Sequence, residues 1–204
     1  VVCGKAAAGS TKHNTSPRDV YYQHLDELIE LVRLSCNYRR ETLDGELKVD
    51  PNLPDMGMPE LDWIPMNQLS GIVVDDTKAE LTGDWREGSG LKNYIEDGYH
   101  YIGANSGGIA RFNFTVPTDG DYEVRVSHQP HPNRSSKTKV TVVNADEEKT
   151  TMVNQQIAPP LDKGFFGLGV HKFSADKPGS VVFSAEGADG NVHIDAVQVL
   201  KLKD

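Results

Sequence analysis

Residues 127–137, SHQPHPNRSSK, bring together side chains that bind polar ligands. His128, His131, Asn133 and Arg134 lie in this segment beside two prolines, which stiffen the loop that we expect here. A guanidinium and an amide held in such a loop present hydrogen-bond donors to sugar hydroxyls or to a carboxylate. A second interpretation stays open, in which the histidines are solvated and Arg134 bonds to carbonyl groups of the loop.

Aromatic residues gather in residues 83–105, a glycine-rich segment that we expect to be irregular. Exposed aromatic faces stack on the apolar faces of sugar rings. The alternative is that at least two of these aromatic side chains belong to the core, and Trp85 is expected to be half-buried. The ligand-binding candidates of the whole chain are Trp85, Tyr99, Tyr101, Asn105, His128, Asn133 and Arg134.

Catalytic motifs are missing from the sequence. It contains no G-x-S-x-G, no H-E-x-x-H and no cysteine close to a histidine. Nothing singles out two of the 30 acidic residues as a pair for glycoside cleavage. We therefore expect a chain that is not an enzyme by itself.

Short segments that alternate apolar and polar residues must position the candidate side chains. From Gly71 onward such segments, rich in Val, Thr, Phe and Tyr, are separated by turn formers such as PTDGD and GADGN. Tyr122, Val124 and Val126 alternate with polar residues, as a strand buried on one face requires. No helical crossover interrupts the series, so residues 71–204 are predicted to form a mainly β domain, an antiparallel β-sandwich.

The first seventy residues have a different pattern. Ser16, Pro17 and Asp19 are typical of a helix start, so we expect one N-terminal helix within residues 1–40. Its apolar stripe needs a packing partner and consists of Tyr21, Leu25, Leu28 and Val32. Residues 41–70 contain four prolines and no sustained period, which predicts a linker that lies against a surface through Met56, Trp63 and Met66.

Composition excludes several classes of function. The formal net charge of −9 and the scattered basic residues argue against nucleic acid as a partner. No run of about 18 apolar residues is present, so no membrane span is expected. Cys3 and Cys36 have neither zinc-ligand spacing nor the density of a disulfide scaffold.

The order of several motifs resembles a known family. GIVVDDTKAELTGDW, GYHYIGANSGGIARFNFTVPTDGDYEVRVSHQPHPNR, VNQ, FGLGVHKF and GNVHIDAVQVL follow one another over residues 71–202. Together they resemble the golvesin C-terminal domain, also described as the xanthan-lyase carbohydrate-binding-like module. The resemblance implies a jelly-roll β-sandwich of the galactose-binding-like type, and a module that is appended to many different enzymes.

The same resemblance implies a metal site. In related carbohydrate-binding sandwiches, an acid on the first strand and an acid on the last strand lie together and hold a structural Ca²⁺. The corresponding residues here are Asp75, Asp76 and Asp195. Because no D-x-D-x-D-G loop accompanies them, the alternative is that Asp75 and Asp195 accept backbone hydrogen bonds at strand ends.

The N-terminal segment CGKAAAGSTKHNTSPRDVYYQHLDELIEL is similar to the C-terminal tail of bacterial FAD-dependent oxidoreductases. The G-x-G-x-x-G nucleotide-binding turn is absent from the 204 residues, so FAD is expected in a parent enzyme and not in this chain.

These observations predict a non-catalytic C-terminal module of a larger FAD-dependent oxidoreductase, which binds carbohydrate or a surface. The alternative is a structural docking domain that packs on the flavin-binding body of the parent enzyme or mediates an oligomer contact. From the proteins that carry such sandwiches, we expect a secreted, periplasmic or cell-envelope location.

Overall fold

The structure, a computed structural model, describes residues 62–202. The expected N-terminal helix with its apolar stripe, and the part of the expected linker up to residue 61, lie outside the described residues. The helices of the described part are three short 3-10 turns, η1 (Met66–Gln68), η2 (Asp76–Lys78) and η3 (Asp162–Gly164). Within residues 62–202 no helix has the length and apolar character that crossing a membrane requires.

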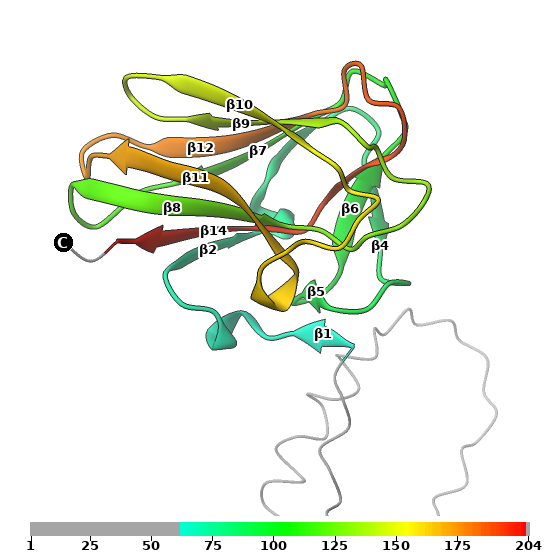
Figure 1. Ribbon diagram of the computed structural model, residues 1–204, viewed down its shortest axis with the longest axis horizontal. Coiled ribbons are helices and arrows are strands. Elements are labelled where there is room, and N and C mark those ends of the chain that lie inside the picture. The colour runs from blue at the N-terminus through cyan, green and yellow to red at the C-terminus, as the bar shows by residue number, and fades with distance from the viewer. Residues whose placement is uncertain (1–61, 203–204) are drawn as a thin grey trace, which may run out of the picture. The chain divides into compact units, whose positions relative to one another are not determined.

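Two antiparallel sheets face each other and form a sandwich (Figure 1). The first sheet has the strand order β10 (Glu148–Val153), β9 (Thr138–Val143), β12 (Gly179–Ser184), β7 (Ile109–Phe114) and β3 (Glu80–Thr82). The second has the order β11 (Phe165–Phe173), β8 (Gly120–Ser127), β14 (Ala196–Lys201) and β2 (Ile72–Asp75). The prediction of a mainly β, antiparallel sandwich is confirmed.

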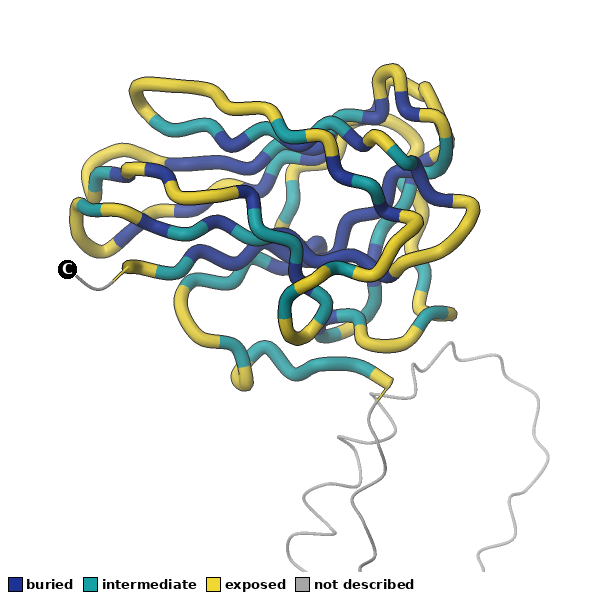
Figure 2. The backbone as a smooth tube through the Cα atoms, viewed as in Figure 1, coloured by how far each residue is buried: buried dark blue, intermediate teal, exposed yellow. Residues whose placement is uncertain are grey.

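The core lies between the two sheets (Figure 2). Tyr122, Val124 and Val126 of β8 are at most 1% exposed, whereas Glu123 and Arg125 are only half-buried. The strand therefore has the two-residue alternation that was read from its sequence. Burial of one face of each sheet holds the two layers together, because apolar area removed from water is the main favourable contribution to folding.

A third, smaller sheet lies at one end of the sandwich and has the order β13 (Val192–Ile194), β6 (Tyr99–Ile102) and β4 (Arg86–Gly88). Next to it, β1 (Trp63–Ile64) pairs in parallel with β5 (Tyr94–Ile95). The expectation that residues 83–105 are irregular is therefore wrong in part, because the short strands β4, β5 and β6 all fall within them. Residues 63–64, expected within the linker, are part of this strand pairing.

Candidate functional site

A pocket of about 440 Å³ opens beside the third sheet. It is lined by Glu87, Gly88, Gly90, Leu91, Tyr99, Tyr101, His131, Asn133, Arg134 and Asn191. Four of the residues chosen from sequence come together in it, namely Tyr99, Tyr101, Asn133 and Arg134. The volume falls within the range of small-ligand sites, roughly 300 to 1,000 Å³.

Two tyrosines of β6 form the aromatic wall of the pocket. Tyr99 and Tyr101 lie two residues apart on the strand, so their side chains share one face, and their ring centroids are 6.5 Å apart. Tyr99 is buried and packs on His193 of β13, with ring centroids 4.4 Å apart, while Tyr101 is half-buried. A Cβ atom at Gly88 would lie 2.7 Å from the Tyr99 ring, so only glycine leaves room for this wall.

Arg134 covers this aromatic wall. Its Cζ atom lies 5.7 Å from the Tyr99 ring centroid and 5.6 Å from that of Tyr101, within cation–π distance. The residue is 5% exposed, and burial lowers the pKa of its guanidinium, an effect that Tyr99 partly offsets. An arginine nevertheless stays protonated at neutral pH.

The Arg134 guanidinium has little bonding within the protein. Its Nη1 atom donates to Asn133 Oδ1 at 3.3 Å, and its buried Nε atom has no partner. Among the carboxylates of residues 62–202, none lies within ion-pair distance of it. Both partners of the guanidinium, Asn133 and Tyr99, are side chains, so the described residues show no bond from it to a carbonyl group of the loop, which was the alternative interpretation.

The backbone around Arg134 is held firmly, in contrast to its side chain. The Arg134 N–H donates to His131 O, and its carbonyl accepts from Gln156 Nε2, both at 2.9 Å. Ser135 N donates to Asn191 O at 2.8 Å, which joins the loop to the turn before β13. A Cβ atom at Gly190 would lie 2.4 Å from Arg134 O, so this close approach requires glycine.

Asp189 fastens the same loop from the other side. Its carboxylate accepts from Ser135 Oγ at 2.9 Å and from Ser136 N at 2.8 Å. Hydrogen bonds from Ser136 and Ser135 lower the pKa of Asp189 to about 2, so this carboxylate stays ionised over the physiological pH range. The loop that carries Asn133 and Arg134 is thus fixed to the segment that carries Asn191.

The other ligand-binding candidates lie outside the pocket lining. The Trp85 indole N–H donates to Thr82 O at 3.0 Å and to Ile109 O at 3.2 Å, and its ring is half-buried against the core, as expected. Asn105 Oδ1 accepts from Gly187 N at 2.9 Å. Both side chains hold loops in place.

His128 corrects the expectation that the histidines of this loop are solvated. It is 2% exposed, and its Nε2 atom lies 3.2 Å from Ile157 O. Burial lowers the pKa of His128 to about 4, so it is neutral at physiological pH. His131, in contrast, is exposed.

Several pocket residues carried no pattern by which they could be chosen in advance. Glu87, Gly88, Gly90 and Leu91 fall in the segment expected to be irregular, and Asn191 follows a turn far along the chain. The one available signal for Asn191 was its place in the quoted motif GNVHIDAVQVL.

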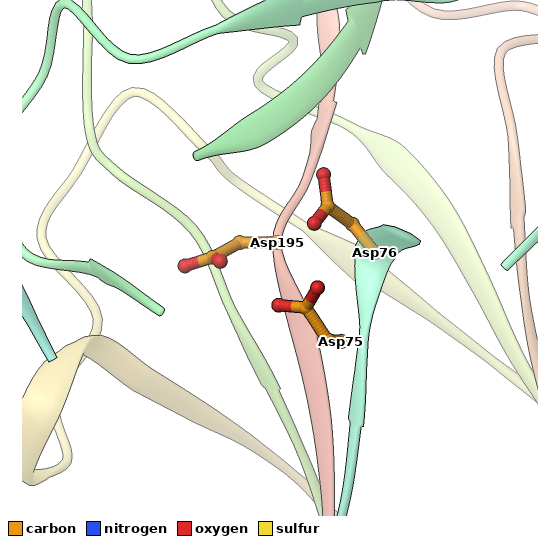
Figure 3. Close-up of side chains that lie close together, drawn as sticks. All are labelled: Asp75, Asp76 and Asp195. Carbon is orange, nitrogen blue, oxygen red and sulfur yellow. The ribbon is translucent and has the colours of Figure 1, made fainter. Parts of the chain in front are cut away.

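A second group of polar residues consists of three buried carboxylates. Asp75 and Asp76 lie at the end of β2, and Asp195 lies between β13 and β14 (Figure 3). Pairing of Ala196 with Asp75 brings the segments together, so one oxygen of each carboxylate lies within 4.8 Å of the others. The expectation that Asp75 and Asp195 accept backbone hydrogen bonds is confirmed, by Thr77 N at 3.3 Å and Ile95 N at 3.0 Å.

Burial strongly favours the neutral form of these carboxyl groups. Desolvation raises the pKa values of Asp75 and Asp195, and desolvation together with the charge of Asp75 raises the pKa of Asp76 to about 8. His100 Nδ1 lies 2.6 Å from Asp76 Oδ2, a contact that requires a proton between the two atoms. The cluster therefore needs protons or a cation to balance its charge.

The donor atoms fit a hard cation. Calcium prefers carboxylate and amide oxygens, and two such acceptors here have no hydrogen-bond donor, Asp75 Oδ1 and Gln129 Oε1. Gln129 touches the cluster through its Nε2 atom, which donates to Asp195 Oδ2 at 2.8 Å. Both residues are buried.

The fold and the pocket define a β-sandwich module, and the sequence places it in a family. The family model of the Golvesin C-terminal domain matches residues 72–201, so the chain belongs to this family. A comparison with curated proteins gives no match.

Several solved structures are similar to this chain. The xanthan lyase of Paenibacillus is similar with a TM-score of 0.58 and 24% identity, over 64% of this chain and 13% of the lyase chain. The CBM35 module of Paenibacillus barcinonensis is similar with a TM-score of 0.43 and 15% identity, over 65% of this chain and 100% of the module. At these levels of identity the similarity concerns the fold alone.

The carboxylate cluster predicts how stability depends on pH when metal ions are removed. The pKa of Asp76 is raised from 3.8 to about 8. Its contribution to the free energy of unfolding is therefore complete below pH 3.8 and is lost as pH rises toward 8. In EDTA, the free energy of unfolding should fall by roughly 1 to 2 kcal/mol between pH 6.5 and 8. The pKa of His128 is lowered from 6.5 to about 4, so its contribution to the free energy of unfolding is lost below pH 6.5, outside this interval.

Urea titrations at several pH values measure this slope, with Asp76→Asn as the matched variant. The variant should show a smaller fall over the same interval. A wild-type stability that is constant or rises from pH 6.5 to 8 in EDTA would contradict the assignment of protons to the cluster.

Proposed function

We propose that the chain is a non-catalytic module that binds carbohydrate in the pocket beside the third sheet. The observation that carries the proposal is the combination of an aromatic wall, Tyr99 and Tyr101, with polar groups at the same opening. Asn133, Arg134 and Asn191 supply amide and guanidinium donors. Sugar sites combine these features, because aromatic faces contact C–H groups while donors and acceptors bind hydroxyls.

The absence of catalysis is supported by the composition of the pocket lining. Glycoside hydrolysis uses two carboxyl groups on either side of the bond that is cleaved. Within the described residues, Glu87 is the one acidic residue that lines the pocket. The membership in the Golvesin C-terminal domain family and the sandwich fold are consistent with a module of this kind.

Saccharide binding is tested with the purified chain by affinity electrophoresis in a panel of neutral and acidic polysaccharides. At least one should retard the wild type, and Tyr101→Ala should weaken that binding about tenfold or more, because it removes half of the aromatic wall. Met152→Ala serves as the control, since it truncates an exposed side chain on β10 away from the pocket.

If no polysaccharide retards the wild type, the binding proposal fails and the docking domain becomes the better interpretation. Such a domain should expose a broad apolar surface. The exposed large apolar side chains of the described part are distributed over several segments: Leu81, Ile109, Met152, Ile157, Val170 and Leu202. Among residues 62–202, these six side chains are the large apolar positions that could contribute to such a surface.

We further propose that Asp75, Asp76 and Asp195 hold a structural Ca²⁺. The support is the spacing of their oxygens within 4.8 Å and the two buried oxygens without donors, on Asp75 and Gln129. The ion would supply the positive charge that three buried carboxylates require, and would contribute to folding and not to a reaction.

Thermal melts with EDTA and with millimolar Ca²⁺ test this site. Calcium at about a thousandfold over its dissociation constant should add roughly 4 kcal/mol of stability, which raises the melting temperature. Asp195→Asn should abolish the shift, because it removes one charged ligand while keeping an acceptor for Ile95 N–H. A wild-type melt that does not respond to Ca²⁺ would contradict the proposal and leave protons as the balancing charge.

We also propose that the sandwich is carried by an FAD-dependent oxidoreductase. The support is the similarity of residues 1–40 to the tails of such enzymes. The test is to read the coding sequence upstream of the codon for Val1. A strand followed by G-x-G-x-x-G is expected there, and a different domain or no coding sequence would contradict the proposal.

A further inference from the structure

Arg134 is a buried cation that lacks an anion in the described part of the chain. It is 5% exposed, its Nε atom has no partner, and its guanidinium bonds to the side chains of Asn133 and Tyr99 and to no carboxylate of the described residues. Burying a charge without a counter-charge costs free energy, and buried charges are normally paired. An unpaired buried cation at the edge of an open pocket indicates that its partner comes from outside the protein.

Hydrogen bonds around Arg134 hold its loop in place but supply no anion to its guanidinium. Its own backbone, the neighbouring serines and Asp189 make a network of hydrogen bonds that fixes the loop. None of these bonds uses the Arg134 side chain, so they leave the guanidinium free to donate. Preorganisation of this kind lowers the cost of binding, because little of the loop must be ordered when the ligand arrives.

The chemistry of the partner follows from the guanidinium and from the wall beneath it. A planar guanidinium presents paired N–H donors that match a carboxylate in a bidentate arrangement. Tyr99 and Tyr101 lie under the same group, and Tyr101, which is only half-buried, keeps ring surface that a sugar can contact beside the guanidinium. Resting on the proposed carbohydrate binding, we infer that the pocket recognises sugars that carry a carboxylate, with Arg134 binding that carboxylate.

The electrostatics of the rest of the molecule make this local contact necessary. The net charge of −9 repels polyanions, so attraction to an acidic sugar has to arise at the pocket itself. Glu87 is the one carboxylate in the lining, and its side chain is 89% exposed and lies 3.9 Å from His100 Nε2. Solvent screens a charge in that position, so Glu87 only partly weakens the attraction between Arg134 and a ligand carboxylate.

The experiment measures the affinity of the purified chain for matched methyl glycosides by isothermal titration calorimetry. The pairs are glucuronide and glucoside, galacturonide and galactoside, and mannuronide and mannoside, which differ only in the group at C6. At least one uronide should bind about tenfold to a hundredfold more tightly than its neutral partner, the range expected for a hydrogen bond to a charged group. Increasing salt should weaken the uronide and leave the neutral glycoside unchanged.

Variants assign the preference to Arg134. Arg134→Gln should remove the difference between the members of a pair, and Arg134→Lys should restore only part of it, since an ammonium lacks the planar fork. Lys137→Gln is the matched control, because it removes an exposed positive charge from the same loop without touching the pocket lining. Glu87→Gln keeps Arg134 in place and should strengthen uronide binding, which covers the case that the arginine variants do not fold.

The outcomes separate this inference from the proposed function. Neutral glycosides that bind as tightly as every uronide would overturn the role of Arg134 and leave carbohydrate binding intact. A uronide preference that survives Arg134→Gln would also overturn it. Absence of binding to all six glycosides and to the polysaccharides would overturn both.

Discussion

One buried side chain, Gln155, joins the parts of the molecule that form the pocket. Its Nε2 atom donates to His193 O at 2.6 Å, and its Oε1 atom accepts from His193 N and from Thr138 Oγ1, both at 3.0 Å. Its own N–H donates to Ser135 O at 2.9 Å. The side-chain amide thus acts as a strand partner for β13, while the backbone N–H of the same residue anchors the loop of Arg134, so both sides of the pocket depend on this residue. Gln155 is fully buried, so loss of its side chain would leave buried polar groups without partners, which costs free energy.

Strand β6 connects two regions of opposite charge. Successive side chains of a strand point to opposite faces, so Tyr99 and Tyr101 face Arg134 while His100 faces Asp76. The two faces of one strand, β6, therefore separate the Arg134 cation from the cluster of buried carboxylates. Within the described residues Arg134 has no anion, and the three carboxylates have His100 alone within ion-pair distance, so each region is suited to a ligand of opposite sign. The fold keeps the two apart because β6 is paired on both sides, with β13 and β4.

The sandwich was predictable because apolar and polar residues alternate clearly along its strands, as around Tyr122, Val124 and Val126 of β8. Strands β4 to β6 were missed, since glycines and short lengths obscure a period of two. Four of the ten residues that line the pocket were predictable from residue type, namely Tyr99, Tyr101, Asn133 and Arg134. The contribution of Asn191 and the burial of His128 were not, because both arise from contacts between segments far apart in the sequence.

If the module binds sugar at the surface beside Tyr101 and Arg134, a ligand should perturb the residues that line this pocket. A ¹H–¹⁵N correlation spectrum of the labelled chain, recorded during titration with an acidic oligosaccharide, measures this directly. Shifts should concentrate in the amides of Tyr101, Asn133, Arg134 and Asn191 and in the Nε–H signal of Arg134. Saturable shifts confined to other regions, such as the loops around Trp85 and Asn105, would contradict it.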